Sequence, residues 1–405
     1  MSSLPLAHRA HAIAKWAAIG IGFSVPIATA LDNVLLFLVL LLWVPGGDYR
    51  RKLAQIRGNP VAVAALSLFG LLVLGGFYGY GDAHDALNYL GKYVDILFIA
   101  LLIPLFREEQ ARRWAIAGFM AAMALTLVLS YVIKTGLFPQ GGLLQGPPDN
   151  PFVFKLHITQ NLFMAFFAYL LAVKARHAAS PRLRLTFALA AALAAYNVLF
   201  MVQGRSGYLA LAALLVYFCF DWLRWRGLAI ALAAGVAIAA AGYATSSGLQ
   251  QRVKLVATEI AAWQPGQGSQ TSSGLRMDYY TNSLAIIRDH PVFGVGTGGF
   301  EKAYAEKIRN TAMAPSNNPH NQYLLITAQL GVIGLAALLY LFYVEWRTAR
   351  LLPPLEQALT RGALLTIMVG SLVNSLLLDH AEGLFFAWIS GVLFAGLQQR
   401  KGDEK

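Results

Sequence analysis

The sequence predicts an all-α protein that crosses a membrane many times. Of its 405 residues, 57% are apolar and only 13% are charged, and the mean hydropathy is +0.55. Soluble domains carry about twice that share of charge. The apolar residues also fall in blocks of about 16–26 residues, long enough for a helix to cross the hydrocarbon core of a bilayer. These observations exclude an ordinary soluble protein.

Twelve such blocks are candidate transmembrane helices, separated by charged or turn-forming residues. The first block ends in small residues, as a signal peptide does, but another apolar block follows at once, so we expect the first helix to be retained. The blocks cover about residues 12–29, 31–46, 59–78, 88–106, 114–133, 157–173, 184–203, 207–222, 227–244, 320–345, 362–378 and 383–397.

Basic residues are distributed unevenly between alternate connections of these blocks. With the N-terminus in the cytoplasm, twenty-one Lys and Arg residues fall on the cytoplasmic side. The short connections on the other side hold only Lys92, Lys134, Lys155 and Arg205, and seven more lie in one long loop. Because positive charge favours the cytoplasmic side, both termini are predicted to be cytoplasmic. The net charge of +12 then reflects topology and anionic lipid headgroups, and no nucleic-acid partner is expected.

The chain is predicted to divide into residues 1–244 with nine spans, a long outer loop over 245–319, and residues 320–405 with three spans and a cytoplasmic tail. A hydrophilic loop of this length usually carries function. Its polar stretch 264–274 predicts flexibility. A helix is predicted from Leu275 to Asp289 with Ser273 as its cap, and the glycines from 294 onwards predict a tight turn.

Three arginines on the outer side are candidates for binding a diphosphate. Arg205 lies in a minimal turn between two spans, Gln203-Gly-Arg-Ser-Gly207, where a charge is costly unless it is paired. Its planar guanidinium matches phosphate oxygens, either those of a ligand or those of lipid headgroups. Arg276 and Arg288 bracket the loop helix, about 18 Å apart at ~1.5 Å rise per residue. They would contact different parts of a large ligand, or remain solvated.

His320 is the candidate general base. It follows Pro319 and is predicted to lie in the first turn of the tenth span, where the helix N-terminus disfavours a protonated ring. An interfacial, hydrogen-bonded histidine is the alternative. Lys155 and His157 open the sixth span on the same side. Asp379 lies between the last two spans and could orient a histidine or arginine, although we favour a helix-capping role.

The sequence indicates no resident metal or cofactor. One cysteine, Cys219, excludes an intrachain disulfide framework and a four-cysteine zinc site. The Asp-x-Asp pair typical of metal-held diphosphates does not occur in the sequence. Arginines are therefore expected to neutralise the charge of a diphosphate leaving group in place of a metal ion.

Taken together, the predicted spans, the long loop and three motifs resemble the O-antigen ligase family of Gram-negative bacteria. The motifs are the Gly-Arg-Ser-Gly turn at 204–207, the segment from Arg276 to His290-Pro-Val-Phe-Gly-Val-Gly-Thr-Gly298, and Pro319-His320-Asn-Gln-Tyr-Leu324. The resemblance implies a GT-C-like, metal-independent glycosyltransferase in the inner membrane with a periplasmic active site. Its donor would be a polysaccharide on undecaprenyl pyrophosphate and its acceptor a sugar of lipid A–core, joined in a single inverting displacement.

The resemblance matches the family's essential histidine to His320 and its arginines to Arg205, Arg276 and Arg288. Lys155, His157, Tyr323 and Asp379 are supporting candidates. Two alternatives stay open: an O-antigen polymerase or related oligosaccharyltransferase, which needs the same base and diphosphate clamp, and an anion transporter. The apolar middles of the predicted spans and the unrepeated long loop argue against a transporter.

Overall fold

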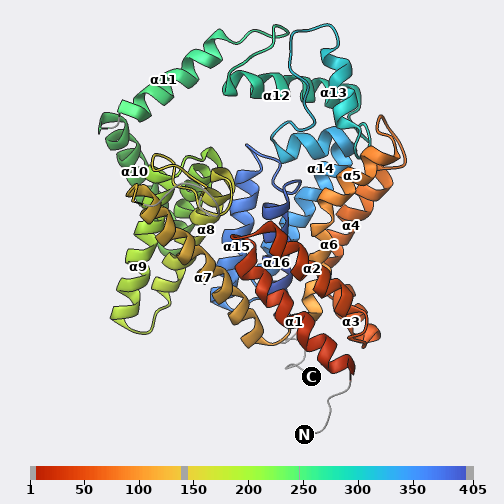
Figure 1. Ribbon diagram of the computed structural model, residues 1–405, viewed down its shortest axis with the longest axis vertical. Helices are drawn as coiled ribbons and strands as arrows, with labels where there is room; N and C mark the ends of the chain where they lie inside the picture. Colours follow the sequence, from red (N-terminus) through yellow and green to blue (C-terminus); the bar gives the residue numbers. More distant parts are fainter. Residues whose placement is uncertain (1–5, 138–144, 246, 398–405) are drawn as a thin grey trace.

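The computed structural model describes residues 6–137, 145–245 and 247–397, and within these ranges it consists of helices and their connections, with no strand. Figure 1 shows their arrangement. The helices are α1 (Leu6–Ser24), α2 (Thr29–Trp43), α3 (Tyr49–Arg57), α4 (Pro60–Gly75), α5 (Ala83–Tyr93), α6 (Asp95–Leu102), η1 (Ile103–Leu105), α7 (Glu109–Lys134), α8 (His157–Arg176), α9 (Pro181–Tyr196), η2 (Asn197–Met201), α10 (Arg205–Thr245), α11 (Ser247–Ala262), α12 (Ser272–Asp289), α13 (Phe300–Ile308), α14 (Gln322–Ala349), α15 (Pro354–Gly370) and α16 (His380–Phe394).

Several of these helices have the length and composition of membrane spans. In the described part of the chain five qualify alone: α7, α8, α9 with η2, the segment Arg205–Ala237 of α10, and α14. Two bent pairs add up to two more, α3 with α4 and α5 with α6–η1, and α2 and α16 are shorter apolar helices. The chain is therefore an all-helical membrane protein with five to seven candidate spans by this criterion.

Two breaks interrupt the long helices. α10 has non-helical backbone angles at Arg224 (φ 56°, ψ −134°), between the predicted spans 207–222 and 227–244. α14 is broken at Gly331 (φ 64°, ψ −161°), so the predicted span 320–345 is not one straight helix. A Cβ at position 331 would lie 2.0 Å from the carbonyl oxygen of Val292, so glycine is required where the loop region packs on α14.

The predicted span 362–378 is wrong in its second half. Helix α15 ends at Gly370, and residues 371–379 form a turn before α16. Hydropathy suggested a helix here because Leu376, Leu377 and Leu378 are apolar, but these side chains are buried in the protein core from a non-helical backbone. This turn becomes one wall of the cavity described below.

The core is built around α16, whose described side chains are almost all buried. Phe385 packs against Phe119 of α7 and Phe163 of α8, with ring centroids 5.3 and 4.9 Å apart. Trp388 lies 6.2 Å from Phe119 and donates to the Ala18 carbonyl of α1. This aromatic cluster ties the first half of the chain to its last helix.

Helices α11, α12 and α13 lie across one end of the bundle, whereas α1 begins at the opposite end (Figure 1). The turn between α12 and α13 is fastened to the bundle by backbone hydrogen bonds. Val295 donates to Ala328 of α14 (2.8 Å), Thr297 donates to Gly75 of α4 (2.8 Å), and Val295 accepts from Tyr80 (2.9 Å). The tight turn predicted from the glycines is thus present, and it holds α12 in a fixed position over the bundle.

The connection between α11 and α12 was predicted to be flexible, but it is attached to α12. The buried Asp278 carboxylate accepts from the Trp263 indole N–H (2.7 Å) and from the Ser269 backbone N–H (3.1 Å). The helix predicted from Leu275 to Asp289 is present and starts three residues earlier. Its cap is Thr271, not Ser273, because the Thr271 hydroxyl accepts from the Gly274 backbone.

Candidate active site

A cavity of about 490 Å³ lies beneath α12, between α8, the start of α14 and the 371–379 turn. Its walls combine apolar side chains with hydroxyl, amide and charged groups. The polar and charged side chains that line it are Thr159, Ser206, Ser272, Arg276, Tyr279, Asn318, His320, Asn374, Asp379 and Glu382. Two of the predicted site residues with opposite charge, Arg276 and Asp379, therefore share one cavity with the predicted base.

His320 lies on this cavity, but not in the first turn of a helix as predicted. Asn321 is the N-cap of α14, and its side chain accepts from the backbone N–H groups of Tyr323 and Leu324. The helix therefore starts at Gln322 and leaves His320 outside it, with a left-handed φ of 53°. Such backbone angles are costly for a residue with a side chain and are concentrated at functional sites.

The 371–379 turn orients His320. The His320 Nδ1 atom lies 3.3 Å from Asn374 Oδ1, and Asn374 Nδ2 donates to Asp379 Oδ2 (3.3 Å). The Tyr279 ring of α12 packs beside the imidazole, with ring centroids 5.9 Å apart. Burial raises the pKa of Asp379 above its usual value, and the charges of His320 and Lys92 oppose that shift. Asp379 does not cap α16 with its side chain, so the capping role that we favoured is wrong.

The residues around His320 attach it firmly to this turn. Gln322 donates its backbone N–H to the Ser371 carbonyl (2.9 Å), and its side-chain oxygen accepts from the Leu377 backbone (3.0 Å). Asn321 donates from its side chain to the Leu372 carbonyl (2.9 Å). The backbone of His320 donates to Asn318 Oδ1 (2.8 Å). The polar residues of the motif 317–324 thus hold the histidine in place from both sides.

Arg205 begins helix α10 because two glycines allow its turn to lie directly on α8. Asn161 of α8 donates from its side chain to the Val202 and Gly204 carbonyls (3.2 and 3.1 Å). A Cβ on either Gly204 or Gly207 would come within 2.8 Å of Asn161. The Gly-Arg-Ser-Gly motif therefore fixes an exposed arginine at a helix N-terminus, whose partial positive charge also favours anions.

Arg276 projects from α12 to the same cavity. Burial and, after it, the nearby charge of Arg205 lower the pKa of Arg276 from its usual value. Among the described residues, no acidic side chain forms an ion pair with Arg205 or Arg276. The guanidiniums of Arg205 and Arg276 are therefore not neutralised by an ion pair within the described part of the chain, and guanidiniums match the geometry of phosphate and carboxylate oxygens.

Comparison with known proteins finds a family match over the middle and later part of the chain. Residues 189–339, which include Arg205, Arg276 and His320, match the family described as O-antigen ligase. The resemblance to the O-antigen ligase family therefore rests on this region of the chain. A protein of Haemophilus influenzae described as uncharacterized is 24% identical in an alignment of 254 residues that covers 60% of this chain. The chain covers 61% of that relative's length.

Arg288 also lies within the region matched by the O-antigen ligase family, but it does not line the cavity. Its side chain is 81% exposed at the C-terminal end of α12, 3.7 Å from Asp289, which also pairs with Lys307. The two arginines that bracket α12 therefore differ: Arg276 lies near Arg205 and His320, whereas Arg288 points to the surface.

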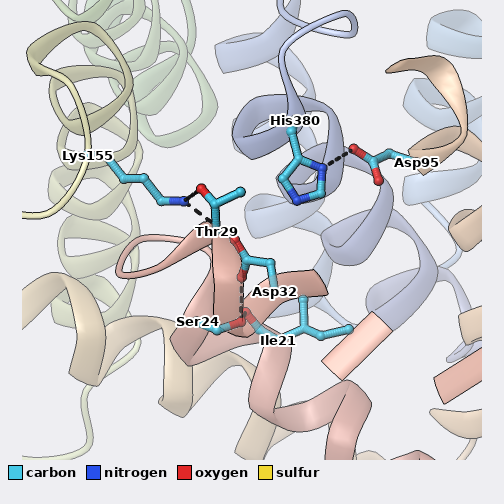
Figure 2. Close-up of polar contacts among 7 residues, drawn as sticks. All are labelled: Ile21, Ser24, Thr29, Asp32, Asp95, Lys155 and His380. Atoms are coloured by element: carbon cyan, nitrogen blue, oxygen red, sulfur yellow. Dashed lines mark hydrogen bonds and ion pairs between the residues drawn. The ribbon is translucent and has the colours of Figure 1, made fainter. Parts of the chain in front are cut away.

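The other supporting candidates lie around the cavity and not on it. Lys155 is buried, donates to the Thr29 hydroxyl (2.7 Å) and forms an ion pair with Asp32 (3.4 Å), as Figure 2 shows. The His157 ring packs on Phe152, with centroids 5.8 Å apart. Tyr323 donates its hydroxyl to the Met368 carbonyl (2.8 Å), which links α14 to α15.

Sequence reasoning missed Asn374, the residue between His320 and Asp379. Asn374 lies within a predicted span, and a polar pair in an apolar block, Asn374-Ser375, is a signal for function that could have identified it. Glu382 is buried and lines the cavity, so it is an additional acidic group on the wall that carries Asp379.

The donor set of the site does not resemble a metal centre. Within the described residues, no group of three or more His, Cys, Asp or Glu side chains is arranged to hold a metal ion. The guanidinium that lines this cavity is that of Arg276, and Arg205 directly precedes Ser206, which also lines it.

Proposed function

We propose that this protein transfers a polysaccharide from undecaprenyl pyrophosphate to a sugar hydroxyl of lipid A–core. The observation that carries the proposal is that Arg276 and His320 line one cavity, while Arg205 lies close enough to Arg276 for its charge to lower the pKa of Arg276. Among the described residues, neither arginine forms an ion pair with an acidic side chain. A diphosphate needs delocalised positive charge, and an acceptor hydroxyl needs a base. Arg276 and His320 would supply both within one cavity of a membrane protein whose residues 189–339 match the family described as O-antigen ligase.

In this proposal His320 accepts the proton of the acceptor hydroxyl as that oxygen attacks the anomeric carbon of the donor. The new carbon–oxygen bond forms as the bond between the anomeric carbon and the phosphate oxygen breaks, which inverts the configuration. The electron pair leaves on undecaprenyl pyrophosphate, and Arg205 and Arg276 neutralise its charge. Of the two α12 arginines left open by the sequence, we assign this role to Arg276.

The proposed membrane arrangement follows the distribution of basic residues. It has twelve spans, nine within residues 1–244 and three within 320–405, with both termini in the cytoplasm and the 245–319 region in the periplasm. Helices α11 to α13 would then cover the periplasmic end of the bundle in the inner membrane. The lipid tails of donor and acceptor would enter the site sideways between helices, so the substrates are drawn from the membrane.

A reconstituted transfer assay tests this function. Purified protein in vesicles receives undecaprenyl-pyrophosphate-linked glycan and lipid A–core in the presence of a chelator, and glycosylated lipid A–core is measured. We expect product from the wild type and at least a 100-fold lower rate from His320→Ala, since general-base catalysis contributes about 10²–10⁴-fold. Equal rates would remove His320 from the chemistry, and complete loss of wild-type product with chelator would contradict metal-independent transfer.

The alternative within the same chemistry is an O-antigen polymerase or related oligosaccharyltransferase, whose acceptor is different. The same vesicles with lipid-linked repeat units as donor and acceptor distinguish the two. Longer lipid-linked chains without glycosylated lipid A–core would replace the ligase proposal with the polymerase. An anion transporter would move a labelled anion into vesicles and form neither product.

A further inference from the structure

We propose that Asn374 is a positioning residue that fixes His320 in the tautomer needed for catalysis, by relaying the orientation set by the Asp379 carboxylate. The catalytic consequence rests on the proposed function, whereas the tautomer is a property of the protein alone. Asn374 lies outside residues 189–339 and outside the motifs at 204–207, 276–298 and 319–324.

The Asp379 carboxylate determines which way the Asn374 amide faces. An ionised carboxylate can only accept hydrogen bonds, so the amide must direct its NH₂ group towards Asp379. Asn374 Nδ2 lies 3.3 Å from Asp379 Oδ2, which is consistent with this direction. The reverse orientation would place two acceptor oxygens against each other. The amide oxygen of Asn374 therefore faces His320.

The amide oxygen in turn determines where the imidazole carries its proton. Asn374 Oδ1 lies 3.3 Å from His320 Nδ1, and an amide oxygen cannot donate a hydrogen bond. Nδ1 must therefore be protonated, which leaves a lone pair on Nε2. His320 lines the cavity, so Nε2 is the atom that receives the proton of a bound hydroxyl. The other tautomer would leave no base on that nitrogen.

The relay also stabilises the charged intermediate. Proton transfer converts the ring to an imidazolium with both nitrogens protonated, and the Asn374 oxygen continues to accept from Nδ1. Asp379 lies one amide away, where the charge of its ionised form and that of His320 attract each other. The proton on Nε2 then leaves to water, and no proton passes through Asn374.

Asn374 is itself held in place, as a positioning residue must be. Its backbone N–H donates to the Gly370 carbonyl (3.1 Å), and its carbonyl accepts from the Gln322 backbone (3.2 Å). The adjacent Ser375 donates to Asn318 Oδ1 (2.7 Å), the same oxygen that accepts from the His320 backbone. Both ends of the His320–Asn374 contact are thus fixed by separate hydrogen bonds.

The tautomer can be measured without substrate. Protein labelled with ¹⁵N only in histidine is placed in nanodiscs, and two-bond ¹⁵N–¹H correlations distinguish the two tautomers. The His320 signal is assigned by its loss in His320→Gln, and the other seven of the eight histidines report on folding. We expect Nδ1–H in the wild type, and a mixture of tautomers in Asn374→Leu. An Nε2–H tautomer in the wild type, or an unchanged spectrum in Asn374→Leu, would overturn the proposal.

Kinetics of the transfer reaction supply the second readout. Asn374→Leu should lower kcat by about 10²-fold with little change in KM, because the base is lost and binding is kept. Asn374→Asp keeps an acceptor for Nδ1–H but holds the imidazole in its protonated form, so the acid limb of the pH–rate profile should move to higher pH. Unchanged kcat and pH profile in both variants would contradict the relay.

Failure of the relay and failure of the proposed function have different signatures. If the wild type has the Nδ1–H tautomer and Asn374→Leu loses it, but no donor and acceptor yield product, the relay stands and the transfer function is wrong. If Asn374→Leu transfers polysaccharide at the wild-type rate, the function stands and the relay is wrong. Asn374→Asp guards against the case in which the leucine variant does not fold.

Discussion

Two groups of basic residues lie near the same end of the bundle, and they differ in whether they have acidic partners. Lys155 and His380 each contact a buried aspartate, Asp32 at 3.4 Å and Asp95 at 3.1 Å, as Figure 2 shows. Arg205 and Arg276 have no such partner among the described residues. Removal of one partner from a buried pair leaves an uncompensated charge and destabilises the fold, whereas charges without acidic partners near a cavity are available to a ligand. The predictions below test this division.

The largest effect is expected from the arginines without partners. Arg205→Ala and Arg276→Ala should each lower kcat/KM for transfer about 10²–10³-fold, since each removes charge from the leaving group. Arg205→Lys should also be damaged, because a bidentate fork becomes a point charge. The matched control is Arg288→Ala, which should stay within about twofold because that side chain is exposed and outside the cavity. A larger loss from Arg288→Ala than from Arg276→Ala would reverse our assignment.

The second effect concerns stability. Lys155→Met leaves the Asp32 carboxylate, which is 0% exposed, without its cation, and removal of one partner of a buried pair costs about 3 kcal/mol or more. We expect a clearly lower Tm, which is measured by the tryptophan fluorescence of the protein in detergent. The double variant Asp32→Asn with Lys155→Met should recover part of the lost Tm, because it removes the unpaired carboxylate. Lys15→Met is the control, because its partner Glu108 is 67% exposed and such pairs contribute about 0–1 kcal/mol.

A full loss of transfer by Lys155→Met at unchanged Tm would place Lys155 in the binding site, as the sequence suggested.

The contrast between Lys155 and the arginines also shows what could and could not be predicted from the sequence. Lys155 was a candidate site residue because the sequence places it on the outer side of the membrane. Its partner Asp32 is 123 residues earlier in the chain, and only folding brings the two together. Arg276 and Arg288 could not be separated either, because which face of α12 meets the cavity depends on how the α12–α13 turn is fastened to α4 and α14.

Prediction succeeded where a local pattern determines local structure. The residues after Pro319 indicated the position of His320, because Asn321 of the same motif caps the helix that follows it. The glycines beside Arg205 indicated a tight turn, which lies directly on Asn161 of α8. It failed for the 371–379 turn, where buried leucines in a non-helical segment have the hydropathy of a helix. Asn374 was hidden for the same reason. Apolar composition reports burial, and it does not distinguish a helix from a packed turn.

The third effect is a pH dependence that separates activity from stability. Because burial raises the pKa of Asp379, this carboxyl gains a proton at a higher pH than an exposed aspartate would as the pH falls. The neutral carboxyl can donate to Asn374 Oδ1, which releases the amide from its orientation. We therefore expect transfer to decline, roughly tenfold per pH unit, below that raised pKa.

Stability should respond with the opposite sign at Asp379. Where the folded state binds this proton more tightly than the unfolded state, the contribution of Asp379 to stability increases as the pH falls. The rate and the Tm of wild type and Asp379→Asn are measured across the acid range, with Lys92 and Glu382 intact in both, since these groups also face the carboxyl. An acid limb that is identical in the two proteins would assign it to a group other than Asp379.

The smallest effect is expected at Tyr323, which belongs to the family motif but has a satisfied hydroxyl. Tyr323→Phe removes only its hydrogen bond to the Met368 carbonyl, so it should cost about 1 kcal/mol of stability and leave kcat within about twofold. The measurement pairs the transfer assay with the Tm of the same preparation. If Tyr323→Phe lowers kcat 100-fold at unchanged Tm, then Tyr323 acts on substrate although its hydroxyl has a partner inside the protein. The division between neutralised structural groups and unpartnered binding groups would then fail at the motif where the sequence is most informative.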